Sequence, residues 1–228
     1  MDGTPGCPPC LFPPGPDRGS AVSVRRGPCT LAWCAAAGLL VLGWAQSAPA
    51  CELPPASNPR LLLRVDDSRS AVAFDAKAFL HSFTGRTSRI RGTVGLADPE
   101  SPDGAAACFR IDAASLETGN GTRDAIMRDE HLETHRFPSI AFDLTQVERA
   151  RRTADGWEFL ARGALTLRDV ARQTQFVVRA RRDGNGVRLT GEVPVKMTDH
   201  GVPVPKFLFL TVEDPVLVRF DVTAIPLP

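Results

Sequence analysis

The chain has 228 residues, of which 23% are charged and 43% hydrophobic, and its formal net charge at pH 7 is +1. This length suits one domain of up to about 200 residues together with a leader. The near-neutral charge balance excludes the strong basic field of a nucleic-acid-binding protein and the polybasic patch of a membrane-surface protein.

The first 50 residues have the pattern of a secretory leader. Arg25 and Arg26 supply positive charge before an apolar run from Leu31 to Trp44, and the small-residue sequence Ala48–Ala50 follows. The apolar run is shorter than the roughly 20 residues that a helix needs to span a membrane. We therefore predict a leader with a secretory signal peptide over residues 1–50, and a mature protein that is periplasmic or secreted.

Residues 1–22 fit neither the signal peptide nor a folded domain. Our hypothesis is that translation starts downstream, near Val22 or Val24, so that these residues are untranslated. Cys51 directly follows the predicted cleavage site, so a lipoprotein with a lipid anchor at Cys51 is the alternative to a freely secreted protein. Residues 51–59 are rich in proline, alanine and serine, and we predict a short extended linker there.

From residue 60 onward, apolar and polar residues alternate with period 2, which is typical of strands with one buried face. The sequence Asp183–Gly186 gives the strongest hairpin signal in the chain. Strands do not alternate with helices, which excludes a parallel α/β sheet and favours an antiparallel barrel or sandwich of about eight or nine strands. The alternating stretches are 60–65, 70–78, 90–96, 105–112, 140–147, 157–167, 176–180, 187–197 and 216–225.

Residues 119–144 interrupt this alternation. Thr122 is predicted to be the N-cap of a short helix, with Asp124 adding negative charge in its first turn. Phe137-Pro138 ends the helix, because a residue before proline is pushed towards extended conformations. The sequence thus predicts one short helix inserted in an all-β domain.

Inward-facing glycines at positions 92, 163 and 191 are expected to permit bends and to leave room inside the domain. Cys108 is the only cysteine of the alternating region. A disulfide framework needs an even number of cysteines in the folded part. We therefore interpret Cys108 as an unpaired, unreactive thiol on a strand.

His131 and His135 stand four residues apart on the predicted helix and could share a zinc ion. A metal-binding hydrolase that uses them is one alternative function. Glu133 does not occupy the position at which the zinc-protease motif places its general base. A third ligand, such as His81 or His200, would also be needed. The other interpretation is two exposed histidines near the end of a helix.

Eight stretches of the body of the chain together form a recognisable pattern: Val65–Phe74, Gly85-Arg86, Arg91-Gly92, Arg123-Asp124, Met127-Arg128, His131-Leu132, Phe137–Phe142 and Gly163–Arg172. With these stretches, the body of the chain, over residues 60–226, resembles the YceI family of secreted bacterial proteins. The resemblance implies an extended, lipocalin-like antiparallel β-barrel with one short helix, over residues 60–228. It also implies a non-enzymatic carrier or store of an apolar lipid in the cell envelope, with a polyisoprenoid or isoprenoid quinone inside and no required cofactor.

Two groups of residues are candidates for the ligand site. Arg123, Arg128 and His131 of the polar helix are candidates for a barrel mouth that holds a headgroup, although such charges are also typical of a solvated helix face. A packed structural envelope module with no ligand is the other alternative function, and the sequence leaves a homodimer open. The inward-facing candidates are Phe74, Val94, Phe109, Ile111, Phe142, Leu165, Phe176, Val178, Leu189, Val193 and Phe220.

Overall fold

The computed structural model describes residues 51–54, 58–78, 82–207 and 210–227, all within one compact unit, Ala45–Pro228. The predicted leader and His81 lie outside the described residues. Within the described ranges, no helix has the length and apolar character that a membrane crossing requires.

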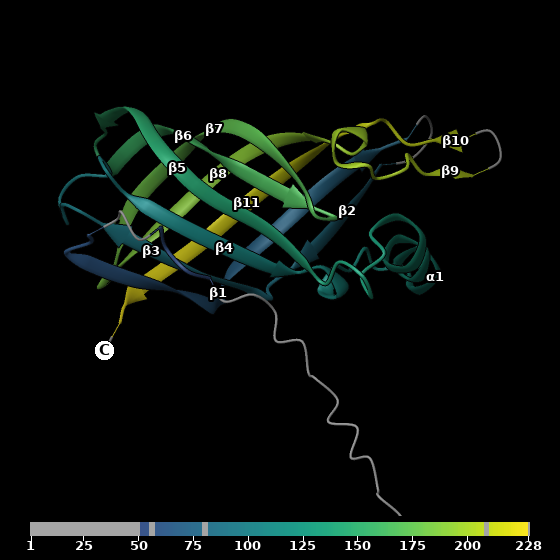
Figure 1. The fold of residues 1–228 in the computed structure, drawn as a ribbon, viewed down its shortest axis with the longest axis horizontal. Helices are drawn as coiled ribbons and strands as arrows, with labels where there is room; N and C mark the ends of the chain where they lie inside the picture. The colour runs from purple at the N-terminus through teal and green to yellow at the C-terminus, as the bar shows by residue number, and fades with distance from the viewer. Residues whose placement is uncertain (1–50, 55–57, 79–81, 208–209, 228) are drawn as a thin grey trace, which may run out of the picture. The chain divides into compact units, whose positions relative to one another are not determined.

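The described chain folds into an antiparallel β-barrel (Figure 1). The strands follow the order β11-β8-β7-β6-β5-β4-β3-β1-β2, and a further pairing of β11 with β1 closes the ring, so the predicted all-β barrel is confirmed. The strands are β1 (Leu61–Lys77), β2 (Ser82–Thr87), β3 (Ile90–Leu96), β4 (Ala106–Asp112), β5 (Ser139–Arg152), β6 (Gly156–Leu167), β7 (Val170–Asp183), β8 (Gly186–Lys196) and β11 (Pro215–Pro226), with a separate pair β9 (Lys206–Phe207) and β10 (Leu210–Thr211).

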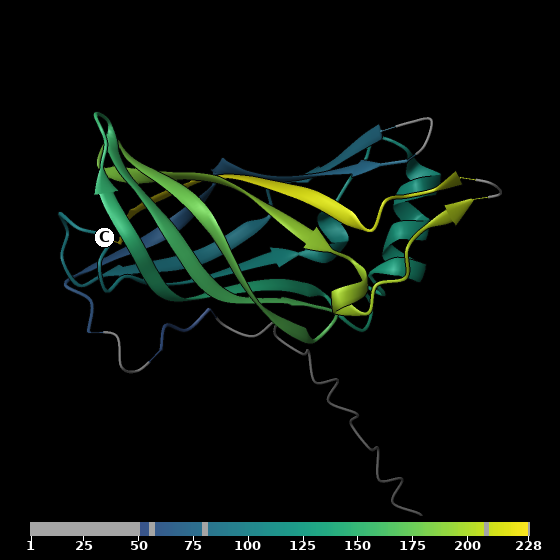
Figure 2. The same cartoon turned by 90° about the horizontal axis from the view of Figure 1, so that it is seen from above.

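The connections gather at two ends of the barrel (Figures 1 and 2). At one end lie the β3–β4 loop, residues 97–105, and the tight turns that join β5 to β6 and β7 to β8. We call this the hairpin end. At the other lie the short helices η1 (Ala113–Ser115), α1 (Gly121–Ile126), η2 (Met127–His131) and η3 (Thr198–His200), and we call it the helix end.

Strand β1 is one strand of 17 residues, where the sequence suggested two segments. Its register against β11 shifts between Asp66 and Ala71. The shifted segment is held by Ser70, whose hydroxyl donates to the backbone carbonyl of Asp66 (2.6 Å). The extra residues of such a bulge change the alternation. Val65 and Val72, which are an odd number of positions apart, are therefore both buried.

The inserted helix differs in detail from the prediction. Asn120, rather than Thr122, is the N-cap, and its side-chain oxygen accepts a hydrogen bond from the Arg123 N–H (3.0 Å). After six residues α1 widens into the π-turn η2, in which the Leu132 N–H donates to the Met127 carbonyl (2.8 Å). Asp124 is the buried residue of α1, whereas Ile126 is 41% exposed, so the turn does not bury an apolar stripe.

Phenylalanine rings occupy the room beside three inward-facing glycines. A Cβ atom placed on Gly92 would lie 2.7 Å from the ring of Phe109, its cross-strand partner on β4. Equivalent atoms on Gly163 and Gly191 would each lie 2.6 Å from a ring, that of Phe142 and that of Phe220 respectively. The space that the glycines were expected to leave is therefore filled by the protein itself, in the manner of aromatic side chains that cover glycines in other sheets.

Gly191→Ala is expected to lower the free energy of unfolding by about 1–3 kcal/mol, as overpacking a barrel wall does. The added methyl group would meet both the Phe220 ring and the Val177 carbonyl oxygen, each at 2.6 Å. Urea unfolding measures the change. Gly121→Ala is the control, because no atom lies within 4 Å of its would-be methyl group. A loss of similar size in both variants would contradict the steric explanation.

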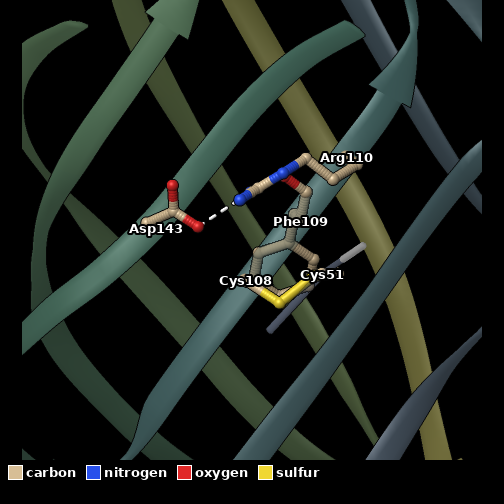
Figure 3. The surroundings of a disulfide bond; sticks show 5 residues. All are labelled: Cys51, Cys108, Phe109, Arg110 and Asp143. Carbon is tan, nitrogen blue, oxygen red and sulfur yellow. Dashed lines mark hydrogen bonds and ion pairs between the residues drawn. A yellow bond between two sulfur atoms is a disulfide. The ribbon is translucent and has the colours of Figure 1, made fainter. Parts of the chain in front are cut away.

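A disulfide joins Cys51 to Cys108 of β4, so the interpretation of Cys108 as an unpaired thiol is wrong (Figure 3). Cys108 faces outward between Ala107 and Phe109, and its Cα atom lies 5.7 Å from that of Cys51, an ordinary separation for a disulfide. The disulfide was not predicted from the sequence, because Cys51 was assigned to a linker outside the folded part. A sulfur in this bond cannot also carry a thioether-linked lipid, so the disulfide and a lipid anchor at Cys51 exclude each other.

The predicted linker lies against the barrel at both of its described ends. A Cβ atom on Gly95 would lie 2.8 Å from the Cδ1 atom of Leu53 and 3.0 Å from the Cβ atom of Pro59. The absent side chain of Gly95 thus gives the segment a place to pack on β3. Beside the disulfide, Arg110 forms an ion pair with Asp143 of β5 (2.7 Å), which links the outer faces of the two strands (Figure 3).

Candidate ligand-binding site

The barrel encloses a cavity of about 200 Å³. Every strand of the closed ring contributes inward-facing apolar side chains to its wall, from Leu63 of β1 to Ala224 of β11. Among the described lining residues, only Glu100, Ser101 and Thr174 carry polar side chains. A smaller apolar cavity of about 150 Å³ in another protein stays dry and binds benzene, so a space of this kind favours an apolar guest over water.

The structure places almost every predicted interior residue on this wall; their role as ligand contacts stays a prediction. Phe74 lies elsewhere. Its ring covers Gly85 of β2, and it meets the ring of Phe83 edge-on with the centroids 6.3 Å apart. The predicted residues that line the cavity are Val94, Phe109, Ile111, Phe142, Leu165, Phe176, Val178, Leu189, Val193 and Phe220.

An aromatic cluster narrows the cavity. The ring centroid of Phe176 lies 5.1 Å from that of Phe142 and 5.6 Å from that of Phe220, and both rings are inclined to it. These separations are typical of attractive aromatic pairs. The cluster draws on β5, β7 and β11, which are not all neighbours in the sheet, so it spans the barrel interior.

The lining also includes residues that the sequence analysis did not select. Trp157 and Ala161 share the inward face of β6 with Leu165, and alternation alone could have found them. Pro99, Glu100, Ser101 and Pro102 of the β3–β4 loop line the cavity too. This loop carried only turn signals, so the sequence gave no reason to bring it to the cavity.

The predicted headgroup residues take other partners at the helix end. The Arg123 guanidinium lies over the ring of Phe83 at 4.4 Å, and Arg128 donates to the Leu116 carbonyl (2.9 Å). The Nδ1 atom of His131 donates to the carbonyl of Pro203 (3.0 Å). None of these three residues is among the described residues that line the cavity. Their contacts fasten the helical segment to the barrel.

A buried carboxylate organises this helical segment. Asp124 is 6% exposed and accepts hydrogen bonds from the hydroxyl and the N–H (2.9 Å) of Thr118. Arg123 in turn donates to the Thr118 hydroxyl (2.7 Å) and carbonyl (3.0 Å). Burial alone would raise the pKa of Asp124, but the two bonds from Thr118 and the charges of Arg128 and Arg123 outweigh it and lower the pKa below its ordinary 3.8.

Asp124→Ala is expected to lower the free energy of unfolding by about 1–3 kcal/mol at pH 7, because the Thr118 N–H loses its acceptor. A carboxyl whose pKa is lowered by folding stabilises above its unfolded-state pKa, and this contribution is lost as the pH falls through the folded-state value. The difference between wild type and variant should therefore shrink below about pH 4. Denaturant unfolding across pH measures it. Asp129→Ala, at an exposed position of η2, should be nearly neutral, and a pH-independent difference for Asp124→Ala would contradict the assignment.

Two of the matching stretches, Phe137–Phe142 and Gly163–Arg172, meet at the helix end, where the Arg168 guanidinium lies over the ring of Phe137 at 5.6 Å. Arg168, in the turn between β6 and β7, forms an ion pair with Glu133 and also donates to the Gly201 carbonyl. Arg168, Asp169 and Glu133 have φ angles of 49°, 57° and 47°, which side chains larger than glycine seldom adopt. The pKa of Glu133 is lowered first by the bond from Arg136 and further by the charge of Arg168. These contacts stabilise a turn with unusual backbone angles. The residues of these stretches therefore have a structural role in the turn.

The histidines do not assemble as the metal hypothesis requires. His135 is exposed, and the Nδ1 atom of buried His200 bonds the Val170 carbonyl (2.9 Å). Across the described residues, no group of three or more His, Cys, Asp or Glu side chains is placed to hold a metal ion. No arrangement in the described part of the chain therefore favours the hydrolase alternative.

A closed antiparallel barrel with a cavity inside belongs to the class of small β-barrels whose interior can hold one small ligand. The chain belongs to the YceI family, since the family model of the YceI-like domain matches residues 63–224. The resemblance noted from the sequence is thus confirmed. None of the curated proteins matches the chain in sequence.

Solved structures with the same fold are similar to this chain. BcnA of Burkholderia cenocepacia is 20% identical, with a TM-score of 0.61 over 70% of this chain and 98% of that protein. A polyisoprenoid-binding domain from Saccharophagus degradans, implicated in plant cell wall breakdown, is 19% identical, with a TM-score of 0.55 over 74% and 100% of the two chains. A YceI protein of Campylobacter jejuni is 16% identical, with a TM-score of 0.53 over 63% and 84%.

Proposed function

We propose that this protein binds a long apolar lipid of the polyisoprenoid class inside its barrel, and carries or stores it in the cell envelope without catalysing a reaction. The observation that carries the proposal is the cavity, whose described wall is apolar apart from Glu100, Ser101 and Thr174. A structural neighbour is a polyisoprenoid-binding domain, which supports this ligand class.

Apolar burial alone supplies enough affinity for such a ligand. Each methylene group moved from water into an apolar interior contributes about 0.8 kcal/mol. A few isoprene units inside the barrel therefore stabilise a complex without catalytic side chains or a metal ion. The alternative of a fully packed structural module fits poorly with an open space of about 200 Å³ along the barrel axis.

The disulfide supports the envelope location. Structural disulfides form and persist in the bacterial periplasm and outside the cell, and they are rare in the cytosol. Cys51 is the residue directly after the predicted cleavage site, and its sulfur is bonded to Cys108. We therefore favour a mature protein that begins near Cys51 and has no lipid on that residue.

Native mass spectrometry of the protein, purified from the envelope without harsh detergent, tests the proposal. The expected spectrum contains a complex heavier than the chain, and organic extraction should release an isoprenoid lipid of the matching mass. A spectrum of the lipid-free chain alone, together with no uptake of added polyprenol or isoprenoid quinone, would contradict lipid binding.

A further inference from the structure

Two of the three polar side chains on the described cavity wall lie at the hairpin end, and the third, Thr174, lies near the start of β7. Glu100 and Ser101 of the β3–β4 loop line the cavity, next to Pro99 and Pro102 of the same loop. Trp157, the second residue of β6, is also on the wall, and its cross-strand partner is Arg152 at the end of β5. A bound lipid would place its polar group where polar side chains meet the cavity, because burying an unpaired polar group is costly.

Two arginines flank this polar part of the wall. The guanidinium of Arg152 lies 4.9 Å from the ring of Trp157, and its Nη2 atom lies 4.0 Å from a carboxylate oxygen of Glu100. The Nη2 atom of Arg182, near the end of β7, lies 3.3 Å from the other oxygen of the same carboxylate. Glu100 thus places a negative charge between two guanidinium groups at the edge of the cavity.

Neighbouring charged groups are engaged elsewhere. Glu158 is bonded by Arg151 and Arg179 on the outer face of the barrel. Asp98 accepts a hydrogen bond from the Glu100 N–H (3.0 Å), and Asp103 accepts one from the Ser101 hydroxyl (3.1 Å), so both carboxylates serve the loop itself. Glu100 is therefore the carboxylate that a ligand would have to displace from Arg152 and Arg182.

We propose that the hairpin end is the headgroup site, and that Arg152 and Arg182 recognise an isoprenoid lipid that ends in a phosphate. The inference rests on the proposed lipid-binding function and adds the chemical class of the headgroup. The ion pairs of Glu100 are exposed, so breaking them costs little. A phosphate forms bidentate, charge-assisted hydrogen bonds with guanidinium groups, which are stronger than these exposed ion pairs. The phosphate then replaces the Glu100 carboxylate while the chain occupies the apolar cavity.

Two lipids with the same chain test the headgroup: geranylgeranyl phosphate and geranylgeraniol. The wild type is expected to bind the phosphate about tenfold more tightly than the alcohol, the size of one charge-assisted contact. Arg152→Gln/Arg182→Gln should remove this preference, so that the variant binds the two lipids with equal affinity. Glu100→Gln should strengthen phosphate binding about threefold, because the competing carboxylate is gone. Native mass spectrometry or tryptophan quenching at Trp157 reports binding.

The matched control is Arg89→Gln/Arg91→Gln, which removes the same charge from exposed positions near the helix end that do not line the cavity. It should keep the full phosphate preference. Equal binding of the two lipids by the wild type, or an equal loss in both double variants, would overturn the headgroup assignment alone. Binding of neither lipid would overturn the proposed function as well. Arginine-dependent binding to phosphatidylglycerol vesicles without isoprenoid would instead assign the pair to a membrane surface.

Discussion

Replacing Cys51 and Cys108 together by alanine is expected to lower the free energy of unfolding by about 4 kcal/mol, according to the chain-entropy model of disulfides. The two residues are 57 positions apart, so the bond closes a long loop in the unfolded chain. Its removal restores that lost conformational freedom and releases the segment that lies on Gly95. Urea unfolding of the oxidised wild type and the variant measures the difference.

Reduction supplies the control for this prediction. The wild type treated with a thiol reductant should unfold at nearly the same urea concentration as the double variant, since both lack the bond and they differ only in the two sulfur atoms. Lipid uptake should persist in native conditions, because Cys108 faces outward while its neighbours Ala107 and Phe109 line the cavity. A loss of less than about 1 kcal/mol would show that the bond adds little to the folded barrel.

Much of the interior could be predicted from the sequence because strand alternation acts locally. On β4 and β6, inward positions such as Phe109 and Leu165 follow directly from period 2. The rule is interrupted where the backbone departs from the pleat. The bulge after Asp66 changes which positions of β1 face inward, and no residue type in that segment indicates how many residues the bulge contains.

The hairpin end could not be predicted, because its parts come together only through the sheet register. Glu100 lies in the β3–β4 loop and Arg182, 82 positions away, lies near the end of β7. Arg152 is the last residue of a third element, β5. The helical segment attracted attention instead, since its charges are adjacent in sequence. In the structure those charged side chains form hydrogen bonds with the same part of the chain: Arg123 donates to Thr118, and Arg128 donates to Leu116.

The disulfide could not be predicted from the sequence for a related reason. The spacing of cysteines predicts a pair only when both are assigned to the folded part, and the prolines around Cys51 suggested a linker. The packing of Leu53 and Pro59 against Gly95 depends on a missing side chain in β3. A glycine in a strand has several explanations, so its role as a docking place for a distant segment is visible only in three dimensions.

Ala161→Phe is expected to reduce lipid uptake more than tenfold. A loss of this size corresponds to roughly two or more methylene groups of the lipid that are no longer buried in the cavity. Ala161 is 2% exposed, lines the cavity from β6, and pairs with Phe176 of the aromatic cluster. A second ring at this level would fill the space beside Phe176 that an isoprenoid chain must occupy. Titration of the variant with polyprenol, followed by native mass spectrometry, measures the loss.

Val177→Phe is the matched control. Val177 follows Phe176 in β7 but faces outward: it is 47% exposed and does not line the cavity. It adds a ring to the same region without entering the cavity, so uptake should match the wild type. The free energy of unfolding of Ala161→Phe should fall by no more than about 3 kcal/mol, since the ring enters an existing space. If a folded Ala161→Phe protein binds polyprenol as the wild type does, the lipid does not lie in the barrel and must bind on its outer surface.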